Sequence, residues 1–130
     1  MEELLEIAKK VSVKLTEREE TVSVIESSSG GLISSSLLAQ PGASAYYIGG
    51  QVVYTAKSIR GVTGLRLRDL KEKNIRSSSE PFALLLGEKG GEMYSTDWCI
   101  TETGAAGPSG NGYGDPAGCL LYTSPSQRDS

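Results

Sequence analysis

One short segment, Glu26-Ser27-Ser28-Ser29-Gly30-Gly31, joins two apolar runs of the chain, Val22 to Ile25 and Leu32 to Leu38. The first run is rich in β-branched residues and the second is compatible with a helix, so the pattern predicts a strand, a tight loop and a helix. Open α/β sheets usually place their chemistry in loops at the carboxyl ends of strands. We therefore expect the serine loop, residues 27–31, to lie at the functional edge of a sheet.

The serine loop has two interpretations. Gly30 and Gly31 lack a Cβ atom, so the backbone there turns sharply and approaches a ligand closely, and the first N–H groups of the following helix point at the same space. This combination favours a site for a ligand or a reacting group. The alternative is that the serines only cap the helix, which is the commonest role of serine at such a junction. The local pattern leaves both interpretations open.

Apolar periodicity predicts further helices and strands on both sides of the loop. Helices are expected at residues 2–17, 30–39, about 65–71 and from 80 onward, and strands at residues 21–25, 51–55, 97–101 and 118–122. Strands and helices alternate, which predicts an α/β layered domain whose central sheet, mostly parallel or mixed, is flanked by helices. We assign residues 1–122 to this domain and residues 123–130 to a polar tail.

The composition limits the classes of function. At 130 residues the chain suits one domain. Its net charge is −3, and its basic residues are scattered apart from a modest cluster at residues 57–76, which argues against a nucleic-acid surface. No apolar run approaches the length of a membrane span, and the chain opens with Glu2 and Glu3 instead of a basic and then apolar leader. These features predict a soluble cytoplasmic protein without a nucleic-acid or membrane partner.

Two residue types narrow the chemistry further. Cys99 and Cys119 lie in apolar runs and are typical of buried small hydrophobic residues, with a disulfide between neighbouring strands as the minor alternative. The chain has no histidine, which removes a Ser-His-Asp arrangement, histidine acid/base chemistry and most zinc sites. Hydrolytic chemistry then needs another base, and we expect no metal and no cofactor.

Three strand ends supply groups that act without histidine. A serine nucleophile is activated by a neutral lysine or by a tyrosinate held close to a cation. Ser27 follows the first predicted strand, Tyr54 and Lys57 lie at the end of the second, and Thr103 follows the third. If these strands are neighbours in one parallel sheet, all four side chains come to the same edge. Each of these signals alone is typical of ordinary packing, capping or solvation.

Four segments in order carry a resemblance to a known family. They are Glu26-Ser27-Ser28-Ser29-Gly30-Gly31-Leu32-Ile33, Pro41-Gly42-Ala43-Ser44-Ala45-Tyr46, Gly49-Gly50-Gln51-Val52-Val53-Tyr54 and Thr103-Gly104-Ala105-Ala106-Gly107-Pro108. The first is similar to the Glu-Ser-Cys-Thr-Gly-Gly signature of the C-terminal domain of the competence/damage-inducible protein CinA, and the match extends from the first helix to about Leu121. The resemblance implies an α/β fold with helices around a central sheet. It also implies an amidohydrolase that converts a small nucleotide, nicotinamide mononucleotide, to nicotinate mononucleotide and ammonia.

The resemblance assigns the first half of the reaction to the serine loop. Ser27 is implied to be the nucleophile that attacks the carboxamide carbon. Backbone N–H groups near Ser29, Gly30 and Gly31 are implied to stabilise the oxyanion, a role that preorganised amides fill well.

The other implied roles belong to the two neighbouring strand ends. Thr103, with Gly104 beside it, is implied to hold the substrate or the tetrahedral intermediate. Tyr54 and Lys57 are implied to take the serine proton and pass it to the leaving ammonia. No metal takes part in this scheme.

The chain departs from the family pattern at Ser28 and Ser29, where the family usually has Cys and Thr, at Ala105, which replaces a larger apolar residue, and in two further places. The family tends to read Tyr-Ser-Asn-Glu-Ala-Lys, whereas only Thr55 and Ala56 separate Tyr54 from Lys57. The chain also stops after one late strand, where the family continues through another strand and a basic terminal helix. The last two departures favour a rival hypothesis, a CinA-like domain that keeps the fold and a nucleotide pocket without catalysis. A phosphate-binding or purely structural module is the third hypothesis.

The short carboxyl end carries an expectation of its own. Without the family's last strand and helix, a sheet edge and an apolar face are left uncovered unless another subunit covers them. We therefore expect either a homo-oligomer or marginal stability.

Overall fold

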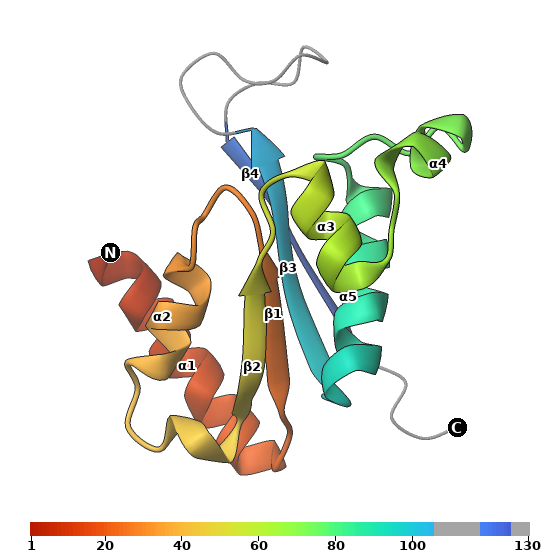
Figure 1. Cartoon of the computed structure of the whole chain (residues 1–130). Coiled ribbons are helices and arrows are strands. Elements are labelled where there is room, and N and C mark those ends of the chain that lie inside the picture. The colour runs from red at the N-terminus through yellow and green to blue at the C-terminus, as the bar shows by residue number, and fades with distance from the viewer. Residues whose placement is uncertain (106–117, 126–130) are drawn as a thin grey trace.

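The computed structural model describes residues 1–105 and 118–125, which form a sheet between two helical layers (Figure 1). The strands are β1 (Val22–Glu26), β2 (Tyr47–Val52), β3 (Trp98–Ala105) and β4 (Gly118–Pro125). They lie in the order β2-β1-β3-β4, in which the first three are parallel and β4 is antiparallel to β3. The predicted α/β layered domain with a mostly parallel sheet is confirmed.

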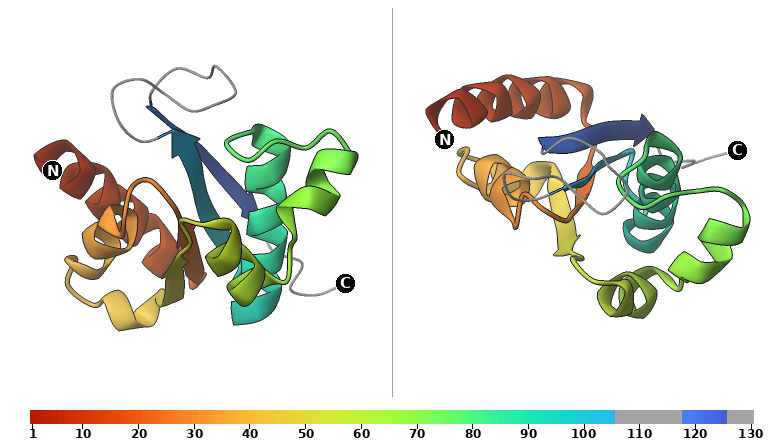
Figure 2. Two further views of the ribbon diagram at one scale, coloured as in Figure 1. Left: turned by 45° about the horizontal axis from the view of Figure 1, so that its top comes forward. Right: turned by 90° about the horizontal axis from the view of Figure 1, so that it is seen from above.

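The helices lie on both faces of this sheet. They are α1 (Glu2–Arg18), α2 (Leu32–Leu38), α3 (Ala56–Thr63), α4 (Leu67–Glu72), α5 (Glu80–Tyr94) and the short 3-10 helix η1 (Ala43–Ala45). Helices α1 and α2 cover one face, and α3, α4 and α5 lie on the other (Figure 2). The expected helices at 2–17 and 30–39 correspond to α1 and α2, and the helix expected from residue 80 is α5.

Strand β1 lies at the centre and contributes to two hydrophobic clusters. One cluster, on the α5 side, contains Ile25, Val53, Ile59, Leu70, Phe82, Leu86 and Cys99. The other, on the α1 and α2 side, contains Ala8, Leu15, Val22, Val24, Leu37 and Tyr46. All five residues of β1 are buried, because successive side chains of a strand point to opposite faces and both faces are covered.

Helix α5 is well started but rich in glycine. Ser79 caps it by accepting a hydrogen bond from the Phe82 N–H at 3.3 Å, and a proline lies in its first turn, as the sequence predicts. The glycines that lower its helix propensity have a packing role. A Cβ atom added at Gly90 would lie 2.5 Å from the Cys99 sulfur and 2.9 Å from Ile25 Cδ1, so only glycine allows α5 to approach the sheet this closely.

The strand predicted at residues 51–55 is misplaced, since β2 begins at Tyr47 and ends at Val52. Its pairing with β1 starts with Val22 opposite Tyr47 and continues through two consecutive glycines, Gly49 and Gly50. A Cβ atom at Gly50 would lie only 2.7 Å from the Val24 carbonyl oxygen. Glycine has a low strand propensity, so the sequence pattern did not indicate that β2 starts before Gly50. In this strand, however, close packing requires glycine.

The residues after β2 begin a helix that the sequence reading missed. Val53 is fully buried, and Thr55 is the N-cap of α3, where its hydroxyl accepts the Ser58 N–H at 3.1 Å. The Ser58 hydroxyl in turn accepts the Thr55 N–H at 2.9 Å, which completes a capping box. The expectation that residues 53–55 belong to a strand is therefore wrong.

The last strand, β4, extends to Pro125, beyond the predicted range of 118–122. Its register with β3 pairs Cys99 with Ser124 and Gly104 with Cys119, so the two cysteines are not cross-strand partners. Cys99 is a free, fully buried thiol, as predicted.

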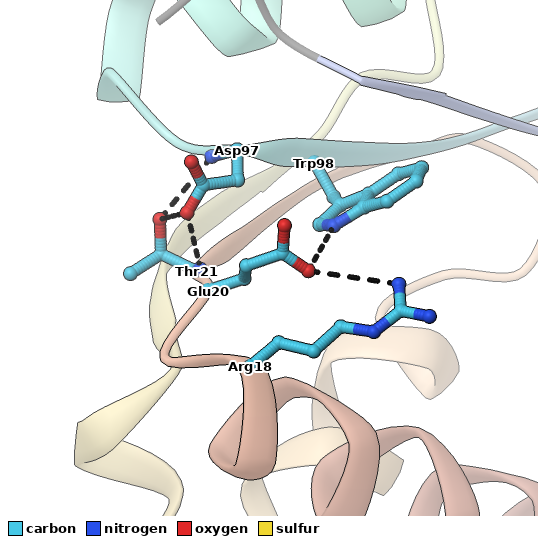
Figure 3. A network of polar contacts seen from close by, with 5 residues as sticks. All are labelled: Arg18, Glu20, Thr21, Asp97 and Trp98. Carbon is cyan, nitrogen blue, oxygen red and sulfur yellow. Dashed lines mark hydrogen bonds and ion pairs between the residues drawn. The ribbon is translucent and has the colours of Figure 1, made fainter.

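Hydrogen bonds join the amino ends of β1 and β3 (Figure 3). The Asp97 carboxylate accepts the Thr21 N–H at 2.8 Å and the Thr21 hydroxyl at 3.3 Å, while the Thr21 oxygen accepts the Asp97 N–H at 3.2 Å. The Trp98 indole N–H donates to Glu20 at 3.2 Å, and Arg18 lies 3.8 Å from the same carboxylate oxygen. These contacts fix the edge of the sheet that lies opposite the serine loop.

Candidate functional site

The carboxyl ends of the parallel strands meet at one edge of the sheet, as expected. The serine loop leaves β1 directly after Glu26, whose carbonyl oxygen accepts the Val53 N–H at 2.8 Å just beyond the end of β2. On its other side β1 pairs with β3, with Ile25 opposite Thr101. The serine loop therefore lies between the segment that leads to Tyr54 and the end of β3 that carries Thr103.

Glu102 of β3 holds the serine loop. Its side chain is fully buried, and its carboxylate accepts the backbone N–H groups of Ser27 at 2.8 Å and Ser29 at 2.9 Å. It also accepts the hydroxyls of Ser28 at 2.5 Å and Ser29 at 2.7 Å. Four donors on three consecutive residues thus converge on one carboxylate, which fixes the path of the loop.

Glu26, the last residue of β1, joins the same loop to the start of α2. It too is fully buried, and its carboxylate accepts the N–H groups of Ile33 at 3.0 Å and Ser34 at 2.9 Å. These N–H groups lie in the first turn of α2, where backbone donors lack helical partners. The carboxylate therefore acts as a helix cap supplied from the strand, and the three serines do not cap α2 as the simple alternative expected.

The Ser29 hydroxyl bridges the two carboxylates. Its oxygen lies 2.7 Å from Glu26 Oε1 and 2.7 Å from Glu102 Oε1. Because a hydroxyl carries one hydrogen, it donates to only one of the two at a time. Burial raises the pKa of Glu102, but the hydrogen bonds from Ser28, Ser29 and Ser27 outweigh burial and leave the pKa of this carboxyl below its ordinary value.

Ser27 is half-buried at the start of the loop. Its N–H and carbonyl are both engaged, the first with Glu102 and the second with the Gly30 N–H at 3.0 Å. Its hydroxyl forms no hydrogen bond with any described residue. The hydroxyl is therefore free to meet a substrate, but no described residue supplies the hydrogen-bonded base that a nucleophilic serine also needs.

Some backbone N–H groups of the serine loop are already hydrogen-bonded, and others have no acceptor among the described residues. The N–H groups of Ser29 and Gly30 are already bonded, to Glu102 and to the Ser27 carbonyl. The N–H groups of Ser28 and Gly31 have no acceptor in the described part of the chain. Gly30 and Gly31 have φ angles of 63° and 103°, which only glycine adopts without strain. Any oxyanion binding by this loop thus falls to Ser28 and Gly31 more than to the Ser29 N–H that the resemblance implies.

Thr103 and Gly104 lie within β3 and not in a loop after it. The Thr103 side chain is 3% exposed, and its hydroxyl has no hydrogen-bond partner among the described residues. Thr101, two residues earlier on the same face, donates to the Ala83 carbonyl at 2.9 Å. A buried hydroxyl without a partner costs free energy, so Thr103 is a polar group whose burial the described residues do not compensate.

Tyr54 and Lys57 stand apart from the loop. Both are exposed, Tyr54 to 66%, and no hydrogen bond joins either of them to Ser27. Lys57 lies in the first turn of α3, where its side chain lines a pocket shared with α4. The structure thus brings Ser27 and Ser29 together with Glu102, and it leaves the two expected proton carriers outside that cluster.

The two glutamates are the residues that the sequence reading missed. Glu26 stands inside the quoted segment without a role, and Glu102 lies between two threonines directly after the strand predicted at 97–101. A carboxylate inside a core strand is rarely buried without partners, and this was the available signal. The partners of Glu102 lie 73 to 75 residues away in the sequence, so no local pattern identifies them.

Two further features of the described residues bear on function. They contain no group of three histidine, cysteine, aspartate or glutamate side chains that could hold a metal ion. None of their helices combines the length and the apolar character of a membrane-spanning segment.

Comparison with known proteins gives one consistent family. The sequence model described as the CinA C-terminal domain matches residues 4–128. A CinA-like protein of Sulfurihydrogenibium is 36% identical over 117 residues, which are 90% of this chain and 29% of that protein. A putative competence-damage inducible protein of Clostridioides difficile is 36% identical over 113 residues, 87% of this chain and 26% of that one. The chain therefore spans less than a third of the length of these relatives.

Solved structures of the same superfamily share the fold. The competence/damage inducible protein of Agrobacterium tumefaciens superposes with a TM-score of 0.82 at 28% identity, over 94% of this chain and 73% of that one. A CinA superfamily protein of Escherichia coli gives a TM-score of 0.80 at 24% identity, over 93% of this chain and 74% of the other. At that level of identity the second likeness speaks for the fold alone.

Proposed function

Since the chain belongs to the CinA C-terminal domain family, we propose that it is a nicotinamide-nucleotide amidase. It would hydrolyse the carboxamide of nicotinamide mononucleotide to nicotinate mononucleotide and ammonia. The observation that supports this proposal most is the serine loop itself. The buried Glu102 carboxylate holds its backbone, and the Ser27 hydroxyl is left without a hydrogen bond to the described residues.

The proposed reaction begins at Ser27. Its hydroxyl oxygen attacks the carboxamide carbon, its proton passes to a base, and the carbonyl oxygen becomes an oxyanion. The N–H groups of Ser28 and Gly31 donate to that oxyanion, and the Thr103 hydroxyl donates to the substrate or the tetrahedral intermediate. When the carbon–nitrogen bond breaks, ammonia leaves with the proton that the base returns. Water then hydrolyses the acyl-serine and releases the carboxylate product.

Lys57 or Tyr54 is the base in this scheme. Neither forms a hydrogen bond with Ser27 among the described contacts, so the segment from Tyr54 to the first turn of α3 has to bring one of them closer when substrate binds. Glu102 is a poor substitute, because the hydrogen bonds that lower the pKa of its carboxyl also weaken it as a proton acceptor.

The exposed positions of Tyr54 and Lys57 support a second candidate function. A domain that keeps the serine loop and a nucleotide pocket, but whose proton carriers stay away from Ser27, would bind the nucleotide without turnover. Titration of the full chain with nicotinamide mononucleotide, with ammonia assayed in parallel, separates the two candidates. Binding with ammonia release supports the amidase, and binding alone supports the inactive domain.

Ser27→Ala tests the assigned nucleophile. We expect it to lower ammonia release by about 1000-fold or more while leaving nucleotide binding within about twofold. Ser28→Ala is the matched control, because it removes a neighbouring hydroxyl that is bonded to Glu102 and leaves Ser27 in place. Full activity in Ser27→Ala would rule out this serine as the nucleophile.

Self-association and a cytoplasmic location complete the proposal. Strands β2 and β4 are the outer strands of the sheet, and Ile48 and Val52 on β2 are 49% and 50% exposed. Exposed apolar residues on an edge strand favour contact with a second copy of the chain. Sedimentation velocity on the full chain tests this, and a stable, well-folded monomer at every concentration would contradict it.

A further inference from the structure

A pocket between α3 and α4 is lined by four basic and two apolar residues. It is formed by Ala56, Lys57, Arg60, Arg66, Leu67 and Arg68. Lys57 and Arg60 lie one turn apart on α3, Arg66 is the N-cap residue of α4, and Arg68 lies in its first turn. Both helices lie on the α5 side of the sheet (Figures 1 and 2).

The positive charges of this basic pocket are not neutralised within the described structure. No acidic residue lines the pocket, and none of its four basic side chains forms an ion pair with a described carboxylate. The nearest acidic residues in sequence, Asp69 and Glu72, lie on α4 outside the lining. Four like charges around one hollow repel each other, so an anion that enters it relieves this repulsion.

We propose that the basic pocket binds the phosphate group of a small-molecule ligand. Three of its four cations are arginines, whose planar guanidinium groups donate paired hydrogen bonds to phosphate oxygens. A phosphate dianion has enough oxygens and enough charge to engage several such groups at once, whereas a carboxylate engages one or two. The chain as a whole carries a net charge of −3, which disfavours a long polyanion such as RNA.

The pocket also lies at the same edge of the sheet as the serine loop. The Val53 N–H is bonded to Glu26, and Lys57 follows four residues later, so its Cα lies at most about 14 Å from that of Val53. One residue of the basic pocket therefore lies close in the chain to the segment that is bonded to Glu26. The phosphate site is proposed from the charges of the pocket and does not depend on the amidase reaction.

Calorimetric titration of the full chain with inorganic phosphate and with pyrophosphate tests this proposal. We expect saturable binding of both, tighter for pyrophosphate, that weakens as salt is raised because the pocket is open to solvent. Chloride and acetate are the comparison anions. Absence of saturable phosphate binding, or equal binding of acetate, would overturn the proposal.

A pair of double variants separates the pocket from the overall charge. Arg60→Ala/Arg68→Ala is expected to weaken pyrophosphate binding by at least about tenfold. Lys10→Ala/Lys14→Ala removes the same charge from exposed positions on α1 and is expected to change binding less than twofold. All four sites are exposed, and circular dichroism checks that both variants are folded. Equal losses in the two variants, or tighter binding of a short RNA than of pyrophosphate, would reject a small-molecule phosphate site.

Discussion

The parallel strands begin at one side of the sheet, here called the amino edge, and end at the other, the carboxyl edge. Polar groups have different roles at these two edges. At the amino edge, Thr21 and Asp97 exchange hydrogen bonds in both directions, and each group serves the other (Figure 3). At the carboxyl edge, Glu26 and Glu102 accept hydrogen bonds from six donor groups of the serine loop and the start of α2, one of which, the Ser29 hydroxyl, lies within reach of both carboxylates. The first arrangement joins two strands, whereas the second immobilises a loop.

This difference identifies the edge that has more than a structural role. Two buried carboxylates cost desolvation free energy, and an apolar loop of the same length would avoid that cost. The carboxyl edge also leaves the hydroxyls of Ser27 and Thr103 without a partner among the described residues. Polar groups that are held in place but not satisfied are typical of a site that awaits a ligand. The following predictions test this difference between the two edges and are ordered by their expected effect on the free energy of unfolding.

Glu102→Ala should have the largest effect. It removes the acceptor of the Ser27 and Ser29 N–H groups and of the Ser28 hydroxyl, while the Ser29 hydroxyl keeps Glu26, so we expect a loss of about 3 kcal/mol in the free energy of unfolding, measured with urea. The amidase activity per folded molecule should fall with it, because the loop that positions Ser27 loses its support. Glu102→Gln retains an acceptor oxygen and should lose less of both. A fully stable, fully active Glu102→Ala variant would show that the loop does not need this carboxylate.

Asp97→Ala should have an intermediate effect that is confined to stability. Asp97 is 9% exposed and accepts two hydrogen bonds from Thr21, so about 1–2 kcal/mol of unfolding free energy should be lost. Activity per folded molecule should stay unchanged, because these bonds lie at the opposite edge of the sheet. An activity loss as large as that of Glu102→Ala would contradict the division between the two edges.

Acid should destabilise the carboxyl edge through Glu102. The pKa of this carboxyl is lower in the folded chain than its ordinary value of about 4.3. Its contribution to stability is therefore complete above that ordinary value and is lost as the pH falls through it toward the folded pKa. Urea unfolding at pH 7, 5 and 3.5 should show a smaller acid loss for Glu102→Gln than for the wild type. Identical pH profiles would mean that Glu102 is not the group that titrates.

Thr103→Val should change stability least. The side chain is buried, valine matches its shape, and the hydroxyl has no described partner to lose, so the free energy of unfolding should stay within about 1 kcal/mol or rise slightly. Activity should nevertheless fall by about tenfold or more if this hydroxyl contacts the substrate. Thr101→Val is the comparison variant, because it removes a hydroxyl bonded to the Ala83 carbonyl and should cost stability without a specific loss of activity. Unchanged activity in Thr103→Val would remove Thr103 from the site.

The sequence predicted the layers and the loop better than it predicted the contacts. The strand–loop–helix order around residues 22–38 follows from local periodicity, and the structure confirms it. The start of β2 was missed because Gly49 and Gly50 read as a loop, although their small size is what the strand packing needs. Helix α3 was missed because its capping box at Thr55 was interpreted as the end of a strand.

The carboxylates were beyond sequence reasoning for a different reason. Glu102 gains its partners only when β3 pairs with β1, and that pairing brings together residues more than 70 positions apart. A local pattern shows the type of a residue but not whether its burial is compensated. The exposed positions of Tyr54 and Lys57 likewise follow from the start of α3, which the spacing of the two residues did not reveal.

The close contact between Gly90 and Cys99 makes the Cys99 thiol a probe of the separation of α5 from the sheet. The Cys99 thiol is fully buried, and burial raises its pKa, so it is doubly protected from alkylation. The space that a reagent would need is occupied by the backbone of α5 at Gly90, so labelling requires this helix to separate from the sheet. In a Cys119→Ser background, the rate of Cys99 modification therefore measures how often that half of the core opens. Comparing this rate with and without nucleotide would report whether a ligand at the carboxyl edge stabilises the helices on the other side of the sheet.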